Sequence, residues 1–156
     1  MKAITIWQPW ATLIVQGAKP YEFRGWKPPR SLIGQRIAIH AGARPIKRDE
    51  VQVLLLQLQD PKYGQPCLHA PLALPVLEIA ARNPKAGALP LSHVLCTAVL
   101  GDAKRGDECA AEFGEQFGND SAREGTFNWG WPLLDIERLE PPVPARGAQG
   151  FWDWTP

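Results

Sequence analysis

Hydrophobic and polar residues alternate with two different periods along the chain, which predicts short strands separated by helices. Residues 2–7 alternate around β-branched positions and indicate a first strand. Trp10, Leu13 and Ile14 have the spacing of a helix with one side against a core. Gly17 is placed to end this helix in a left-handed conformation.

The same patterns predict further elements along the chain. Strands are expected at residues 20–26, 36–41, 94–100 and 127–136, the last broken by Gly130, and helices at 49–58, 72–81 and 107–117. Short strands with helices inserted between them favour an α+β fold around a mostly antiparallel sheet or small barrel. With no internal repeat or linker, residues 1–156 are expected to form a single domain.

Composition narrows the class of protein. The chain is 45% hydrophobic and 21% charged, which is ordinary for a soluble globular protein. No apolar run approaches the roughly 20 residues needed to span a bilayer, so no membrane partner is expected. The three cysteines are an odd number without a CxxC spacing, which favours a reduced, cytoplasmic protein with no disulfide partner.

Charge is distributed unevenly although the net charge is only +1. Residues 1–48 hold nine Lys or Arg and one acid, Glu22, so this part carries about +8; the rest holds eight basic and fifteen acidic residues, about −7. A local positive field of this kind favours binding to a polyanion, provided that folding gathers the basic side chains on one face.

The stretch from Gly17 to Trp26 combines the residue types that bind an anionic, aromatic ligand. Strand alternation predicts Glu22, Arg24 and Trp26 on one face and Tyr21 and Phe23 on the other. Lys19 precedes the strand, in the turn before Pro20, from which it can reach either side. A nucleotide fits this set of groups.

The motif Gly17-x-Lys19-x-x-Glu22-x-Arg24, after the start Trp-Gln-Pro-Trp at residues 7–10, resembles the signature of ASCH domains (activating signal cointegrator homology). The C-terminal pattern, from Trp129-Gly130-Trp131 through Gly147 and Gly150 to Trp152, is also similar to that family. The resemblance implies a PUA-like small β-barrel, mostly antiparallel, with surrounding helices. It also implies a cleft for RNA between barrel and helices.

Small members of the family are linked to two activities, and the resemblance implies both as candidates. One is hydrolysis of single-stranded RNA with a divalent metal, and the other is removal of the acetyl group from N4-acetylcytidine. The deacetylating type has a lysine matching Lys19 and a threonine at the position of Glu22. Because this chain has glutamate there, a ribonuclease is favoured over an amidohydrolase, and a non-catalytic RNA- or partner-binding module is the third alternative.

Lys19 and Glu22 are the candidate catalytic residues. The Lys19 ammonium is expected to neutralise a phosphate or to stabilise charge that develops on a phosphoryl oxygen. Arg24 is expected to clamp a phosphate, with Glu22 as general base or metal ligand. The structural alternative is a Glu22–Arg24 ion pair that only holds the mouth of the barrel.

Further residues are expected to bind nucleic acid, through charge, base stacking or acid–base chemistry. They are Tyr21, Arg24, Trp26, Lys27, Arg30, His40, Arg44, Asn128 and Trp131. The expected partner is single-stranded RNA or a nucleoside. No dedicated metal site is predicted, although a nuclease would bring in a divalent ion such as Mg²⁺.

Overall fold

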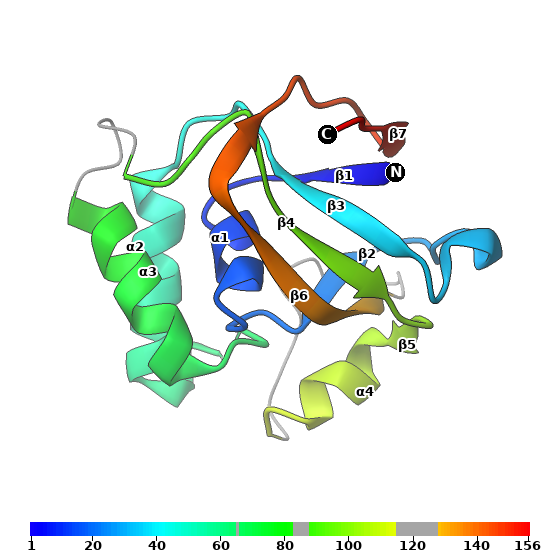
Figure 1. Cartoon of the computed structure of the whole chain (residues 1–156). Coiled ribbons are helices and arrows are strands. Elements are labelled where there is room, and N and C mark those ends of the chain that lie inside the picture. Colours follow the sequence, from blue (N-terminus) through cyan, green and yellow to red (C-terminus); the bar gives the residue numbers. More distant parts are fainter. Residues whose placement is uncertain (65, 83–87, 115–127) are drawn as a thin grey trace.

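The computed structural model describes residues 1–64, 66–82, 88–114 and 128–156, and it confirms the predicted α+β fold. A strongly curled sheet forms a half-barrel, with helices packed around it (Figure 1). Helices α2 and α3 lie together on one side of the barrel, while α4 lies beside β5 (Figure 1). The sheet is mostly antiparallel, as the sequence predicts.

The strands are β1 (Lys2–Ile6), β2 (Tyr21–Arg24), β3 (Arg36–Ala41), β4 (His93–Leu100), β5 (Lys104–Arg105), β6 (Trp129–Pro144) and β7 (Phe151–Asp153). The helices are α1 (Trp10–Val15), α2 (Arg48–Gln59), α3 (Ala70–Arg82) and α4 (Gly106–Ala111), with 3₁₀ turns η1 (Arg30–Leu32) and η2 (Pro61–Tyr63). The helix expected at 107–117 ends at Ala111 instead. Residues 115–117 of this expected helix and Phe127 of the expected strand 127–136 lie outside the described residues.

The strand order across the sheet is β2-β6-β4-β3-β1-β7, and β5 adds to β6 off this path. The pairing of β1 with β3 is parallel, and the other pairings between described strands are antiparallel. The chain thus places the edge strand β2 between β1 and β3 in sequence, although β1 and β3 are neighbours in the sheet.

Strand β6 is longer than the sequence predicts, because it continues through Gly130 and through the proline-rich residues 141–144. Its first part pairs with β2 and β5, and its later part pairs with β4. The β4–β6 register shifts twice, between Val94 and Cys96 and between Thr97 and Val99. Such irregularities bend a strand, which lets β6 follow the curl of the barrel.

One side of the barrel lacks a backbone ladder, and we call it the seam: the side where β2 faces β1 and β7. Within the described sheet β2 pairs with β6 alone. Side chains bridge the seam instead. Arg24 Nη2 donates to the Thr5 carbonyl oxygen at 3.2 Å, and the Trp26 and Phe151 rings meet edge to face at 6.2 Å.

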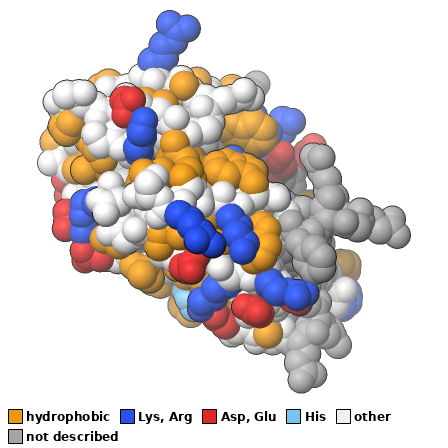
Figure 2. Space-filling model, turned by 90° about the vertical axis from the view of Figure 1, so that its right-hand side faces the viewer, with side chains coloured by type: hydrophobic (Ala, Val, Ile, Leu, Met, Phe, Trp, Pro, Cys, Tyr) orange, Lys and Arg blue, Asp and Glu red, His pale blue; other side chains and the backbone are white. Residues whose placement is uncertain are grey.

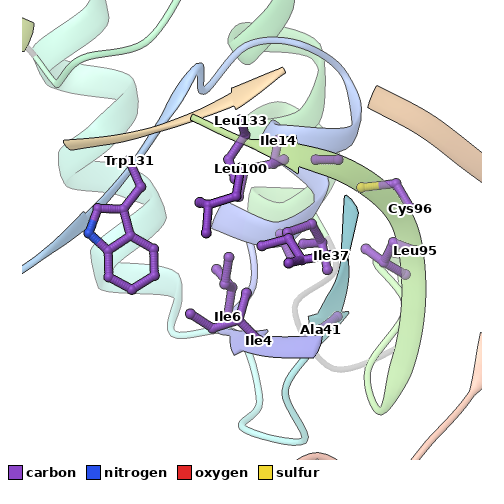
Figure 3. Packing of buried hydrophobic residues seen from close by; sticks show 13 residues of the cluster. Ile4, Ile6, Ile14, Ile37, Ala41, Leu95, Cys96, Leu100, Trp131 and Leu133 are labelled. Atoms are coloured by element: carbon purple, nitrogen blue, oxygen red, sulfur yellow. The ribbon is translucent and has the colours of Figure 1, made fainter. Parts of the chain in front are cut away.

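The barrel interior is filled by aliphatic side chains and one large aromatic ring. Figure 3 shows Ile4 and Ile6 of β1 together with Ile37 of β3, Leu100 of β4 and Trp131 of β6. Trp131 is fully buried. Burial of each large aliphatic side chain contributes roughly 1.5–3 kcal/mol, so this cluster is a main source of stability.

Helix α1 lies between this core and a second one. Its Ile14 packs into the barrel core, whereas its neighbour Leu13 packs against α2 and α3. Both are fully buried, as the i, i+3, i+4 pattern with Trp10 predicts. The short helix is therefore fixed from two sides, which also fixes the chain that leaves it toward β2.

None of the helices within the described ranges has both the length and the apolar character required to cross a membrane. Cys96 and Cys109 are buried, and burial raises the pKa of the Cys96 thiol to about 12 and that of Cys109 to about 11. These two side chains therefore act as small apolar residues rather than as thiolates at neutral pH.

Close packing of α4 on the sheet makes Gly130 a stability determinant. A Cβ at this position would lie 2.4 Å from Cys109 Sγ and 3.1 Å from the Phe23 ring. Gly130→Ala should therefore lower the free energy of unfolding by about 1–3 kcal/mol, measured by denaturant titration. Gly25→Ala is the matched control, because nothing lies within 4 Å of a Cβ there.

A second substitution separates overpacking from a general glycine effect. Cys109→Ala removes the nearest atom, so it should restore part of the stability that Gly130→Ala loses. Equal losses in the Gly130→Ala variants with and without Cys109→Ala would contradict the packing account.

Candidate functional site

The turn between α1 and β2 holds Lys19 against the end of the helix. Gly17 has a φ of +73°, a conformation that favours glycine, and its N–H donates to the Ile14 carbonyl oxygen. The N–H groups of Ala18 and Lys19 both donate to the Leu13 carbonyl oxygen, at 2.9 and 3.1 Å. The predicted helix stop is thus confirmed, and it directs the Lys19 side chain back over α1.

Lys19 is a buried lysine with one strong hydrogen bond. Its side chain is 4% exposed, and Nζ donates to the Tyr21 carbonyl oxygen at 2.7 Å. Nζ also lies over the rings of Trp10 and Phe23, 5.2 and 5.0 Å from their centroids. The rings and the carbonyl compensate the buried charge, and the ammonium keeps further N–H groups for a ligand.

Glu22 lies between two cations. Its Oε1 accepts a hydrogen bond from Arg24 Nε at 2.9 Å, and its Oε2 is 3.7 Å from Lys19 Nζ. The second distance is too long for a hydrogen bond, so Oε2 is the less engaged oxygen. Glu22 and Arg24 share one side of β2, as strand alternation predicts, and Lys19 lies on that same side.

These three side chains line a pocket of about 420 Å³ at the seam. Its walls come from β1 and the residue after it, from α1, from the turn and strand β2, and from the segment before β7. The lining residues are Thr5, Ile6, Trp7, Trp10, Lys19, Glu22, Phe23, Arg24, Ala148, Gln149 and Gly150. The pocket therefore joins a positively charged wall to an aromatic one.

Tyr21, predicted to bind nucleic acid, faces away from this pocket. It is buried, and its hydroxyl donates to the Glu112 carboxylate, while Lys104 Nζ donates to the hydroxyl at 3.1 Å. Burial, together with the Glu112 hydrogen bond, raises the pKa of Tyr21 above its usual value of 10.0. Its side chain lines a separate cavity of about 370 Å³ beside β6.

Trp26, Trp131 and Phe151 form an aromatic cluster next to the seam. Trp26 is 42% exposed and meets the buried Trp131 ring edge to face at 4.7 Å. Trp131 Nε1 donates to the Trp26 carbonyl oxygen, and its ring lies parallel to that of Phe151. Trp131 therefore supports Trp26 from inside the barrel, and Trp26 presents the accessible surface.

His40 lies behind the pocket wall rather than in it. Its side chain is 1% exposed, and Nε2 donates to the Ala145 carbonyl oxygen at 3.0 Å. Nδ1 is then the acceptor for the Thr5 hydroxyl, which in turn accepts from Trp152 Nε1. This chain of bonds ties the segment before β7 to β1 and β3.

Gly147 lets that segment pass close over the histidine. A Cβ at Gly147 would lie 2.5 Å from His40 Cε1 and 2.6 Å from Thr5 Oγ1. The backbone therefore lies directly on the His40–Thr5 pair, and residues 148–150 follow as the pocket wall. His40 thus acts on the pocket by positioning a wall segment.

The basic residues of the first third are partly neutralised by acids from the rest of the chain. Arg36 pairs with Asp135 and Glu137 across the sheet, and Arg44 pairs with Glu50. Figure 2 shows a face on which Lys and Arg side chains lie beside a hydrophobic patch, with Asp and Glu side chains among them. On the face shown in Figure 2, acidic side chains therefore lie among the basic ones, so the basic side chains do not form a continuous positive surface there.

The remaining predicted residues lie around the barrel. Lys27 Nζ lies over the Trp129 ring, 4.2 Å from its centroid, and Arg30 begins η1 with an exposed side chain. Within the described part of the chain, neither of these cations is in an ion pair. Arg44 lies over the Trp7 ring, and Asn128 is buried at the start of β6, where its carbonyl oxygen accepts from Gly106 N.

Trp7 and residues 148–150 line the pocket, and sequence reasoning missed them. Trp7 carried a signal that was available: Ile4 and Ile6 face the core, so alternation puts Trp7 on the outer side, where a large aromatic is unusual. The segment 148–150 carried no comparable signal, because its contact with β1 and β2 depends on the barrel closing.

Metal ligands are scarce in this pocket. Glu22 is the one carboxylate among its described lining residues, and its Oε1 is already bonded to Arg24. Across the part of the chain that the structure describes, no group of three or more His, Cys, Asp or Glu side chains is placed to hold a metal.

Sequence and structure comparisons agree on the family. The model of the ASCH domain family matches residues 4–124, and the chain therefore belongs to the ASCH domain family. Members of this family are generally RNA-binding. The curled half-barrel with surrounding helices confirms the fold that the residue 17–24 motif implies.

An ASCH protein from Zymomonas mobilis has a similar solved structure, with 20% sequence identity and a TM-score of 0.50. The match covers 92% of this chain and 72% of that chain. A mutant of an ASCH protein from the same organism gives 18% identity and a TM-score of 0.49 over the same shares. At this identity the likeness concerns the fold. No curated protein matches the sequence significantly.

The buried position of His40 predicts a pH dependence of stability. Burial lowers the pKa of His40 below its usual value of 6.5, against the opposing hydrogen bond to Ala145. The unfolded chain then binds the proton more readily, so the free energy of unfolding is at its full value above pH 6.5 and falls as the pH decreases below it. Denaturant titrations at several pH values from about 8 to about 5 measure the slope of the free energy of unfolding against pH.

His40→Gln should flatten this slope, whatever its effect on stability at neutral pH. The control is His69→Gln, at an exposed position away from the pocket, which should keep the slope of the wild type. A slope that is the same in all three proteins would contradict the assignment to His40.

Proposed function

We propose that the seam pocket binds one nucleotide of a single-stranded RNA and that Lys19 and Glu22 cleave the strand there. The observation that carries the proposal is the Lys19 ammonium, buried in the pocket wall next to Arg24 and with N–H groups left for a ligand. The RNA-binding character of the family supports RNA as the ligand.

The size and lining of the pocket suit a nucleotide. A volume of about 420 Å³ is within the range of roughly 300–1,000 Å³ that is usual for small-molecule sites. Lys19 and Arg24 supply the charge that a phosphate needs, and the rings of Trp10 and Phe23 supply apolar wall for a base or ribose. Trp26, Lys27 and Arg30 remain predicted contacts for the strand outside the pocket.

The three charged groups can divide the work of RNA cleavage. Glu22 Oε2 accepts the proton of a ribose 2′-hydroxyl, and the 2′-oxygen attacks the adjacent phosphorus. Lys19 stabilises the charge that grows on a non-bridging oxygen, while Arg24 holds the phosphate and orients Glu22. The P–O5′ bond breaks, and the proton from Glu22 passes to the 5′-oxygen, giving a cyclic phosphate and a 5′-hydroxyl.

A resident divalent metal does not fit this set of donors. The lining offers a single carboxylate, Glu22, and two cations lie beside it, whereas Mg²⁺ is held through oxygen ligands in octahedral geometry. The proposed steps therefore involve the side chains of the chain alone.

Removal of the acetyl group from N4-acetylcytidine is the second candidate, and one observation favours it. The pocket encloses a volume suited to a single nucleoside, with a buried amine beside a carboxylate. Glu22, where the deacetylating type has threonine, argues against it. The test is incubation of the protein with N4-acetylcytidine. Release of cytidine by the wild type but not by Lys19→Met would favour this reaction over RNA cleavage.

Arg24→Ala should weaken binding to a short single-stranded RNA about tenfold, because a charge-assisted phosphate contact is lost. The negative slope of log affinity against log salt concentration should also become shallower by about 0.7, the value for one lost phosphate contact. Fluorescence anisotropy at several salt concentrations measures both. Lys62→Ala is the control: this exposed lysine pairs with Asp60 and does not line the pocket. Equal affinities for Arg24→Ala and Lys62→Ala would refute the phosphate contact.

Cleavage is tested with Lys19→Met, which keeps the apolar stem, and with Glu22→Gln, which keeps the shape of the side chain. Each should lower the rate on single-stranded RNA by at least about 10²-fold, with and without Mg²⁺. Glu140→Gln, at an exposed glutamate that does not line the pocket, should keep the rate of the wild type. Tight RNA binding without cleavage by any of the proteins would leave the third alternative, a binding module.

A further inference from the structure

Trp7 stands out among the pocket residues because it is a large aromatic exposed to solvent. It follows the last residue of β1 and is 53% exposed, while Ile4 and Ile6 before it are buried in the barrel core. Its ring belongs to the lining of the seam pocket, together with Lys19 and Arg24. An exposed indole at the rim of a charged pocket is a typical surface for binding a ligand.

The segment after β3 fixes the Trp7 ring from one side. Gly42 N donates to the Ile6 carbonyl oxygen at 2.9 Å, and a Cβ at Gly42 would lie 3.1 Å from Trp7 Cδ1. The absence of a side chain therefore lets the backbone pack against the edge of the indole. Gly42 therefore borders one edge of the indole.

Arg44 covers the Trp7 ring with its guanidinium group. The guanidinium carbon lies 3.9 Å from the ring centroid, and Glu50 holds the group through hydrogen bonds of 2.7 and 3.4 Å. One side of the indole is thus occupied by a cation that is itself fixed, and exposed surface of the ring remains on the pocket side. A rigid aromatic plane next to cations is the usual platform for bases of single-stranded nucleic acids.

We infer that Trp7, backed by Arg44, stacks the base of the nucleotide adjacent to the one in the pocket. This inference rests on the proposed function and specifies its ligand: a strand of at least two nucleotides, not a free nucleoside. Lys19 and Arg24 hold the phosphate, and the strand passes from them over the rim to Trp7. A single nucleotide held by Lys19 and Arg24 meets Trp7 only as part of the pocket wall, so it gains less from this ring than a longer strand does.

The test compares affinities for a ribonucleoside monophosphate, a dinucleotide and a trinucleotide by competition against a labelled oligonucleotide. The wild type should bind the trinucleotide on the order of tenfold or more tightly than the monophosphate. Trp7→Ala should remove most of this gain and lower the affinity for the monophosphate much less than that for the trinucleotide, whereas Trp7→Phe should keep most of the gain. Tyr63→Ala is the matched control, since Tyr63 is an exposed ring under a lysine outside the pocket.

An abasic trinucleotide separates stacking from a structural effect of the substitution. A set of trinucleotides is used, each with one abasic position. If a base stacks on Trp7, the strand that lacks this base should bind the wild type more weakly. In Trp7→Ala the same missing base should cause no further loss of affinity. A loss of affinity in Trp7→Ala that is equal for the intact and abasic strands would overturn the inference.

The two proposals fail in distinguishable ways. If Arg24→Ala weakens binding but Trp7→Ala binds every length as the wild type does, the stacking inference is wrong and the pocket assignment stands. If the trinucleotide binds no more tightly than the monophosphate, the extended ligand is wrong. If the wild type binds none of these probes, both proposals fail.

Discussion

The Glu22–Arg24 ion pair links the two sides of the seam, and the pocket lies at this link. Glu22 holds Arg24, and Arg24 reaches across to the Thr5 carbonyl oxygen of β1. No backbone ladder joins β2 to β1 in the described sheet. The hydrogen bond from Arg24, whose side chain Glu22 holds in place, therefore links these strands where strand pairing links the others. The pocket lies on the side of the barrel where β2 and β1 do not pair. Direct pairing of these two strands would close that side, so the pocket exists because the sheet is open there.

The parts of the site that are local in sequence were predictable. Alternation along residues 21–24 put Glu22 and Arg24 on one side, and the glycine after α1 marked the turn that holds Lys19. The bounds of β3 and the α+β fold also followed from apolar periodicity, because short segments with one buried face carry a clear period. The resemblance of the motif to ASCH domains added the barrel itself, which periodicity alone left open.

What the sequence did not predict depends on contacts between distant segments. Proline lacks an N–H donor, so the stretch from 141 to 144 did not suggest strand, yet these residues continue β6 where it pairs with the start of β4. Tyr21 and Trp131 are aromatic residues of the type that stacks on bases. In the structure, the Tyr21 hydroxyl bonds to Glu112 and Trp131 fills the barrel core. Trp7, in contrast, is not among the predicted binding residues, although its ring is exposed and lines the pocket.

The close passage of Gly147 over His40 has a consequence for how such a pocket can diversify. The chain is anchored at Ala145 and again at Phe151, which pairs with Ile4, while Ala148 and Gln149 between them are exposed. Side chains at these two positions can therefore change size or polarity without disturbing the barrel or the charged groups on β2. Selectivity for a ligand can evolve, or be engineered, on this short bridge independently of the reactive residues opposite it.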